Sequence, residues 1–219
     1  MTDSSYLFLA VAGVAAAADW YAVSREGRLL EYACKPATIL ALIGVALTLD
    51  PQVDGRRVAF VVALLFSLAG DVFLMLRHDG SGRTEKGYFV QGLAAFLFAH
   101  LSYIVGFQIQ GGAVWLVLLL FVLIRAGTLP ITVKLLSSLK EKDLVKFAAP
   151  VRAYAIVICG MVAAAAATGE PLAIAGASLF LFSDFLIAWS RFVTRLTWAP
   201  LAIIVTYHLA QVGLVLSLA

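Results

Sequence analysis

The chain has 219 residues, of which 63% are hydrophobic and only 13% charged, and its formal net charge is +3. This apolar share lies far above that of soluble domains, so the composition excludes a soluble globular protein. The small positive charge indicates contact with anionic lipid headgroups, and no basic patch suggests a nucleic-acid partner.

Eight apolar segments follow one another along the chain, each long enough to approach the span of a bilayer. A hydrocarbon core about 30 Å thick takes about 17 to 25 helical residues. The segments are continuously apolar and lack the alternation of membrane-barrel strands, so helices are expected. The predicted spans are residues 6–23, 34–49, 58–76, 88–108, 113–133, 151–167, 172–189 and 198–218. No linker divides them, so residues 1–219 are predicted to form a single polytopic membrane domain.

The positions of lysine and arginine predict the orientation. Thirteen of the 16 lie in or beside the loops after the first, third, fifth and seventh spans, whereas only Arg56 and Arg57 lie on the other side. Because cytoplasmic loops carry the excess of positive charge, both termini are predicted to lie outside. A bacterial protein of this kind would reside in the cytoplasmic (inner) membrane. The polar segment 134–146 predicts a short amphipathic helix on the cytoplasmic surface.

The two halves of the chain resemble each other. The third and seventh spans each carry an aspartate, and the fourth and eighth spans resemble each other in carrying "HLSY" at His100 and "YHLAQ" at Tyr207. This likeness indicates a duplicated four-helix unit. Because four is an even number, the two copies would be parallel and related by an axis along the membrane normal.

Asp71 and Asp184 are the acids within the third and seventh spans, in "FSLAGDVFLMLR" and "FLFSDFLIAWSR". They precede Arg77 and Arg191 by six and seven residues, which places both roughly 10 Å below the cytoplasmic edge at about 1.5 Å per residue. Ionisable groups inside spans cost about 2.5 to 3.5 kcal/mol and usually mark functional sites. The alternative is a hydrogen bond or ion pair that only joins helices.

Several other polar residues also lie within the apolar spans. The spacing of His100 and Tyr103 places them on one helix face. Ser183, Tyr207, His208 and Gln211 are also polar residues on apolar helices, and a structural role is the alternative for each. Lys35 begins the second span, where it either snorkels or binds a phosphate headgroup. Asp19 is expected to pair with Lys35 or Arg25, and Arg125 with an acid or a cluster of carbonyl groups.

Metal-ligand patterns are absent from the sequence. Hydrolytic zinc usually has three protein ligands with a fixed spacing such as HExxH, and this chain has no such motif. We therefore expect neither a metal nor another cofactor.

Several segments in a fixed order resemble the YhhN family, also called the TMEM86 family, from the second to the eighth span. They are "CKPATILAL", "FSLAGDVFLML", "GLAAFLFAHLSYIVGF", "GASLFLFSDFLIAW" and "YHLAQ". The resemblance implies an eight-helix membrane hydrolase that cleaves the vinyl ether bond of lysoplasmalogens to a fatty aldehyde and glycerophosphoethanolamine or glycerophosphocholine. The matching positions are Lys35, Gly70, Asp71, His100, Tyr103, Ser183, Asp184, Tyr207 and Gln211. His208 departs from this likeness, since an aromatic residue is expected there.

The implied chemistry requires a proton donor for the alkene carbon and a group that stabilises the resulting oxocarbenium ion and activates water. Two carboxyls suffice, because burial and a neighbouring like charge favour the protonated form of one of them. We predict Asp71 and Asp184 as this pair, without assigning which is acid and which is base. The predicted supporting residues are His100, Tyr103, Ser183, Tyr207 and Gln211. Lys35, Arg77 and Arg191 are predicted to bind the headgroup of a lysophospholipid.

Two other functions compete with this interpretation. An intramembrane aspartyl protease also uses two aspartates, but its GxGD motif would require glycine in place of Leu68. A small-molecule or proton-coupled transporter, or a lipid-binding protein, agrees with parallel repeats. Transporters, however, usually contain broken helices, and Pro130 is the only proline deep in a span.

Overall fold

The computed structural model describes residues 2–50, 53–76 and 82–219, and within these ranges it is helical without strands. Eight of the described helices are long and apolar enough to cross a membrane, in agreement with the predicted fold class. They are α1 (Asp3–Ser24), α2 (Arg28–Thr48), α3 (Asp54–Leu76), α4 (Gly82–Ile109), α5 (Val114–Glu141), α6 (Ala148–Ala167), α7 (Pro171–Phe192) and α8 (Ala199–Leu216).

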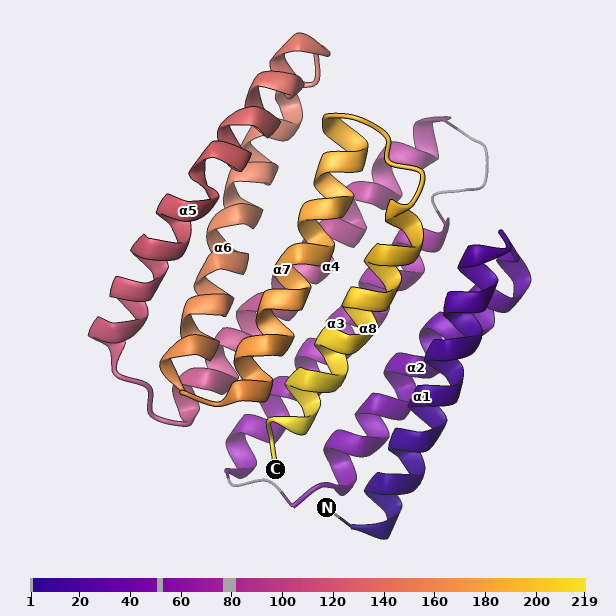
Figure 1. The fold of residues 1–219 in the computed structure, drawn as a ribbon, viewed down its shortest axis with the longest axis vertical. Coiled ribbons are helices and arrows are strands. Elements are labelled where there is room, and N and C mark those ends of the chain that lie inside the picture. Colours follow the sequence, from indigo (N-terminus) through magenta and orange to yellow (C-terminus); the bar gives the residue numbers. More distant parts are fainter. Residues whose placement is uncertain (1, 51–52, 77–81) are drawn as a thin grey trace.

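Six of these helices pack as a closed ring. The neighbouring pairs are α2–α3, α3–α4, α4–α6, α6–α7, α7–α8 and α8–α2. The remaining two helices lie outside the ring, α1 against α2 and α8 and α5 against α6 and α7. Figure 1 accordingly shows α5 at one edge of the bundle and α1 at the other. Each outer helix therefore covers a seam between two ring helices.

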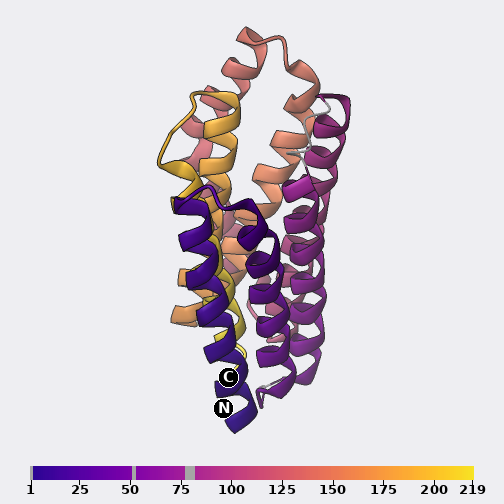
Figure 2. The ribbon, with the colours of Figure 1, turned by 90° about the vertical axis from the view of Figure 1, so that its right-hand side faces the viewer.

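The ring has the same order of neighbours when the two halves of the chain are exchanged. Replacing α2, α3 and α4 by α6, α7 and α8 reproduces every neighbouring pair, and it places α3 opposite α7 and α4 opposite α8. Two parallel repeats would produce this order of the ring helices, whereas the outer helices do not follow it, because α1 packs on α8 but α5 packs on α7. Both termini lie at the same end of the bundle (Figures 1 and 2), as an even number of spans requires. That this end faces outside remains a prediction.

Helix α5 extends well beyond its predicted span. It continues to Glu141, so the expectation of a separate amphipathic helix at 134–146 is wrong. The reason is tertiary packing: Leu135 and Leu139 are buried in a cluster with Phe89, Phe147 and Phe192. Burial of these two leucines packs the C-terminal part of α5 against the bundle, so the helix continues without a break.

Close approach of α7 and α8 depends on glycine. A Cβ added at Gly176 would lie 2.8 Å from both the carbonyl oxygen of Ala210 and the backbone nitrogen of Leu214. Small residues permit such contacts between membrane helices. The resulting tight pair fixes where α7 and α8 present their polar side chains.

Arg56 lies in the first turn of α3 and is almost fully buried. Its Nη2 donates a hydrogen bond to Ser217 Oγ at 3.0 Å, and its guanidinium lies 5.1 Å from the ring centroid of Phe60 and 5.6 Å from that of Phe107. Such cation–π contacts stabilise a charge removed from water. Arg56 thus ties α3 to the end of α8.

Candidate active site

Asp71 projects from α3 into the ring, where its side chain is 5% exposed. The hydroxyl of Tyr207 on α8 donates a hydrogen bond of 2.8 Å to Asp71 Oδ2. Helices α3 and α8 are not neighbours in the ring, so this bond crosses its interior. A predicted acid and a predicted supporting residue thus meet directly.

Asp184 enters the ring from the opposite side, on α7. The hydroxyl of Tyr154 on α6 donates a hydrogen bond of 2.5 Å to Asp184 Oδ2, and His100 Nε2 on α4 lies 3.6 Å from the same oxygen. His100 is fully buried, and neither of its ring nitrogens has a hydrogen-bond partner among the described residues. The second acid is therefore held by a tyrosine and faces a histidine.

Aromatic rings separate the two acids. The ring of Phe180 packs 4.7 Å from that of His100 and 5.3 Å from that of Tyr207, between ring centroids. Phe180 is four residues before Asp184 on α7, so the two side chains lie on one helix face. The acids occupy opposite sides of one buried aromatic layer.

A cavity of about 420 Å³ lies between α4, α5, α6 and α7, beside Asp184. This size is within the range of small-molecule sites. Most of its described lining is apolar, with Asp184, Tyr154 and Arg125 among the polar exceptions. The Asp184 side chain is 11% exposed, whereas Asp71 and His100 are absent from the described lining. Phe182 also lines the cavity and is 45% exposed, so the cavity reaches the outer surface of α7.

Tyr103 and Gln211 connect α4 with α8 across the ring. The Tyr103 hydroxyl donates a hydrogen bond of 2.5 Å to Gln211 Oε1, and both side chains are fully buried. Ser183 donates to the carbonyl oxygen of Ile203 at 3.1 Å, which joins α7 to α8. These three side chains line no part of the cavity among the described residues, and their contacts fix the ring helices.

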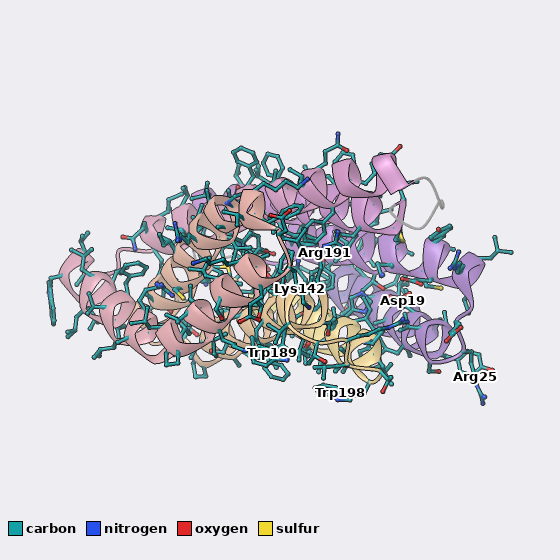
Figure 3. The ribbon with its side chains drawn as sticks, turned by 90° about the horizontal axis from the view of Figure 1, so that it is seen from above. Asp19, Arg25, Lys142, Trp189, Arg191 and Trp198 are labelled. Carbon is teal, nitrogen blue, oxygen red and sulfur yellow. The ribbon has the colours of Figure 1, made fainter. Side chains whose placement is uncertain are left out.

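Lys35 and Arg191, two of the three predicted headgroup residues, lie on different helices and have different partners. Lys35 Nζ pairs with Glu31 Oε1 at 2.5 Å on α2, away from the cavity. The guanidinium of Arg191 lies 3.8 Å from the ring centroid of Phe89, which lines the cavity. Figure 3 shows Arg191 near Lys142 in the view from above. Arg77 lies outside the described residues.

Asp19 does not pair with Lys35 or Arg25 as expected. Its Oδ2 lies 3.8 Å from His208 Nε2, and Trp20 Nε1 donates a hydrogen bond of 3.1 Å to His208 Nδ1. Arg25 points away from the bundle in Figure 3, while Asp19 lies inside it. The expectation is wrong because α1 packs against α8 as well as α2, and this turns Asp19 toward His208.

Arg125 also differs from its expectation of an acid or a carbonyl cluster. Its Nη1 donates hydrogen bonds to the hydroxyls of Thr128 at 3.0 Å and Thr132 at 3.2 Å. Both partners lie on its own helix face, because their spacings are three and seven residues. The arginine is therefore held by neutral groups in the cavity wall.

Sequence reasoning missed Tyr154 and Trp20. Tyr154 is the only aromatic residue in the alanine-rich segment Ala148–Ala167, and this isolation could have identified it. Trp20 sits near the end of the first span, where an interfacial aromatic residue is the ordinary interpretation. Its bond to His208 depends on the packing of α1 against α8, which no local pattern predicts.

Potential metal ligands occur only in pairs within the described part of the chain. Asp184 lies near His100, and Asp19 near His208. No group of three or more histidine, cysteine, aspartate or glutamate side chains gathers there as a candidate metal site.

Eight membrane-spanning helices, with tyrosine-bound acids in a closed ring and an apolar cavity beside one of them, define a multi-pass integral membrane protein with a candidate enzyme-like site. The chain belongs to the YhhN family, whose sequence pattern matches residues 30–218. This match confirms the resemblance found in the sequence, and it spans α2 to α8.

Two similar proteins carry the same name, lysoplasmalogenase TMEM86B. The protein from Homo sapiens is 34% identical over 187 residues, which cover 84% of this chain and 72% of the human protein. The protein from Sus scrofa is 34% identical over 158 residues, which cover 71% of this chain and 61% of the pig protein. No solved structure matches the chain significantly.

Proposed function

We propose that this protein hydrolyses the vinyl ether bond of lysoplasmalogens, yielding a fatty aldehyde and glycerophosphoethanolamine or glycerophosphocholine. The names of its relatives support this reaction class. The observation that carries the proposal is the position of Asp184, a carboxyl bonded to Tyr154 in the wall of a largely apolar cavity. Such a cavity suits a single-chain lipid, and the carboxyl supplies the proton that the reaction needs.

Asp184 is the proton donor in this proposal. Tyr154 donates its hydrogen bond to Oδ2, which leaves Oδ1 to carry the proton. That proton moves to the alkene carbon remote from the ether oxygen, and the alkene electron pair forms the new C–H bond. A lone pair of the ether oxygen then forms the oxocarbenium ion, and the Asp184 carboxylate left behind stabilises this cation.

Water completes the reaction. A water molecule adds to the cationic carbon and returns a proton to Asp184, which gives a hemiacetal and restores the acid. The hemiacetal then breaks its bond to the glycerol oxygen as its hydroxyl proton passes to that oxygen, which releases aldehyde and alcohol. One carboxyl therefore serves in turn as acid and base, so the overall reaction consumes only water.

Asp71 and His100 act as positioning residues. Neither belongs to the described cavity lining, so neither is expected to touch the substrate. Asp71, held by Tyr207, supplies negative charge on the far side of the aromatic layer, where it favours the cationic transition state. His100, 3.6 Å from Asp184 Oδ2, restricts the orientation of that carboxyl.

The direct test is to incubate the purified protein in lipid nanodiscs with 1-alkenyl lysophosphatidylethanolamine and to detect free aldehyde by mass spectrometry. The 1-alkyl analogue is the control, because a saturated ether cannot form the oxocarbenium ion by protonation of an alkene. Absence of aldehyde from the active preparation would overturn the proposal. Lipid binding without cleavage would favour the lipid-binding alternative, and cleavage of a transmembrane peptide would favour the protease.

A further inference from the structure

Arg125 is a charged residue of the cavity wall that the proposed reaction does not use. It lies within α5, and its Nη1 donates hydrogen bonds to the hydroxyls of Thr128 and Thr132. Among the described residues, Nη2 and Nε have no hydrogen-bond partner and the guanidinium has no carboxylate within ion-pair distance. A guanidinium offers five N–H donors, so most of its capacity remains for another molecule.

The charge of Arg125 also has no counterpart in the described cavity lining when Asp184 is protonated. Arg125 and Asp184 are the charged residues of the described lining. In the proposed reaction Asp184 carries a proton before turnover and is neutral. Arg125 is then the one charged residue in the described cavity lining. A cation held within a membrane protein is costly unless an anion or a water-filled space compensates it. The cavity therefore selects for a ligand that is largely apolar and carries one anionic group.

We propose that Arg125 binds the phosphate of a single-chain phospholipid whose hydrocarbon chain fills the rest of the cavity. This inference rests on the proposed function and identifies the residue that recognises the phosphate of its substrate. The planar guanidinium suits a phosphodiester, because two parallel N–H groups can bind two phosphate oxygens. Thr128 and Thr132 fix the arginine through Nη1.

The spacing of the cavity residues agrees with a lysoplasmalogen. Thr128 Oγ1 contacts Cys159 Sγ on α6 at 3.6 Å, and Tyr154, which binds Asp184, lies five residues earlier on the same helix. Five residues correspond to about 7.5 Å of helix rise. Only the three glycerol carbons and their oxygens separate the phosphate of a lysoplasmalogen from its vinyl ether. In this proposal one molecule contacts Arg125 through its phosphate and Asp184 through its vinyl ether, since both residues line the same cavity.

Lys35 and Arg191, which were also predicted to bind the headgroup, fit this role less well. Lys35 lies on α2 outside the described cavity lining and already pairs with Glu31. Arg191 follows Asp184 by seven residues on α7, about 10 Å along the helix, and packs on Phe89. Arg125, in contrast, lines the same cavity as the proposed proton donor.

The test measures binding without cleavage. A 1-alkyl lysophospholipid, which has no vinyl ether, and the corresponding 1-alkyl glycerol, which has no phosphate, are titrated against the protein in nanodiscs. The wild-type protein should prefer the phosphorylated lipid. Arg125→Gln should weaken binding of that lipid by about 10- to 100-fold, the usual effect of losing hydrogen bonds to a charged group, and leave the alkyl glycerol within about twofold. Arg125→Lys should be intermediate, because it keeps the charge but loses the planar fork.

Arg152→Gln is the matched control, since Arg152 is an exposed arginine on α6 outside the described cavity lining. The affinity of this variant for the phosphorylated lipid should equal that of the wild-type protein. Equal binding of the phosphorylated lipid by wild type and Arg125→Gln would overturn the inference. If Arg125→Gln does not fold, wild-type affinity in Arg125→Lys would overturn it.

A competition arm separates the possible sources of the phosphate. Inorganic phosphate at the concentration of the bound lipid should leave binding unchanged, and displacement of the lipid at that concentration would overturn the assignment to a lipid phosphate. The 1-alkyl probe cannot be cleaved, so its binding is measured independently of hydrolysis. If binding depends on the phosphate but the alkenyl lipid releases no aldehyde, the proposed hydrolysis is overturned and this inference is not.

Discussion

The hydroxyl of Tyr207 lies 2.8 Å from Asp71 Oδ2 and joins α8 to α3 through the interior of the six-helix ring. This bond places one predicted acid against an aromatic layer and away from the described cavity lining. Asp184, in contrast, reaches the cavity while Tyr154 holds one of its oxygens. The two acids thus have similar tyrosine partners but different access to the cavity.

Removal of the Asp71 charge should slow the reaction without weakening substrate binding. Asp71→Asn is expected to reduce kcat by about 100-fold, typical of an electrostatic group acting on the transition state, with KM changed by less than about threefold. Tyr207→Phe should have a smaller effect, because the charge remains and only its orienting bond is lost. Steady-state aldehyde release measures both. A rise in KM at unchanged kcat would contradict this role.

Asp184→Asn should abolish turnover, since an amide cannot supply the proton. Loss of a general acid lowers rates by about 100- to 10,000-fold, and Tyr154→Phe should cost about tenfold through a misoriented carboxyl. Ser190→Ala, on the same helix outside the described cavity lining, is the control and should retain wild-type activity. Single-turnover aldehyde formation is the measurement. Substantial activity in Asp184→Asn would remove this residue from the reaction.

The sequence was sufficient to predict the number and nature of the membrane spans, because long apolar segments between polar loops admit few other structures. It also predicted Asp71 and His100 as buried polar groups and Asp184 as a polar group that faces the interior. It could not predict that a tyrosine holds each acid, since the partner depends on which helices lie across the ring. The position of a residue along its own helix can be read from the sequence, whereas its neighbours on other helices depend on how the helices pack.

The same distinction explains the wrong expectations. Asp19 faces His208 because α1 packs against α8. The distribution of charged residues in the loops does not predict that contact. The extension of α5 depends on Leu135 and Leu139 meeting phenylalanines from three other segments. Arg125 binds threonines of its own helix at spacings of three and seven residues, which the sequence contains.

His208 and Asp19 should contribute to stability as a pair. His208→Phe alone leaves a fully buried carboxyl without its nearest polar neighbour, and it should cost about 1 to 3 kcal/mol of unfolding free energy. Adding Asp19→Asn removes the stranded charge, so the double variant should recover about 0.5 to 3 kcal/mol relative to additivity. Thermal unfolding in detergent of all four proteins completes this cycle. Simple additivity would show that the two side chains do not interact.

Gly176→Ala should destabilise the contact between α7 and α8. The new Cβ would lie 2.8 Å from the backbone oxygen of Ala210 and the backbone nitrogen of Leu214, and backbone atoms cannot rotate away as a side chain can. Overpacking of this kind costs about 1 to 3 kcal/mol. Gly127→Ala is the matched control, because no atom lies within 4 Å of its added Cβ and alanine favours a helix over glycine by about 1 kcal/mol. The two variants should therefore shift the unfolding temperature in opposite directions, and a Gly176→Ala protein as stable as wild type would mean that the two helices are not packed this closely.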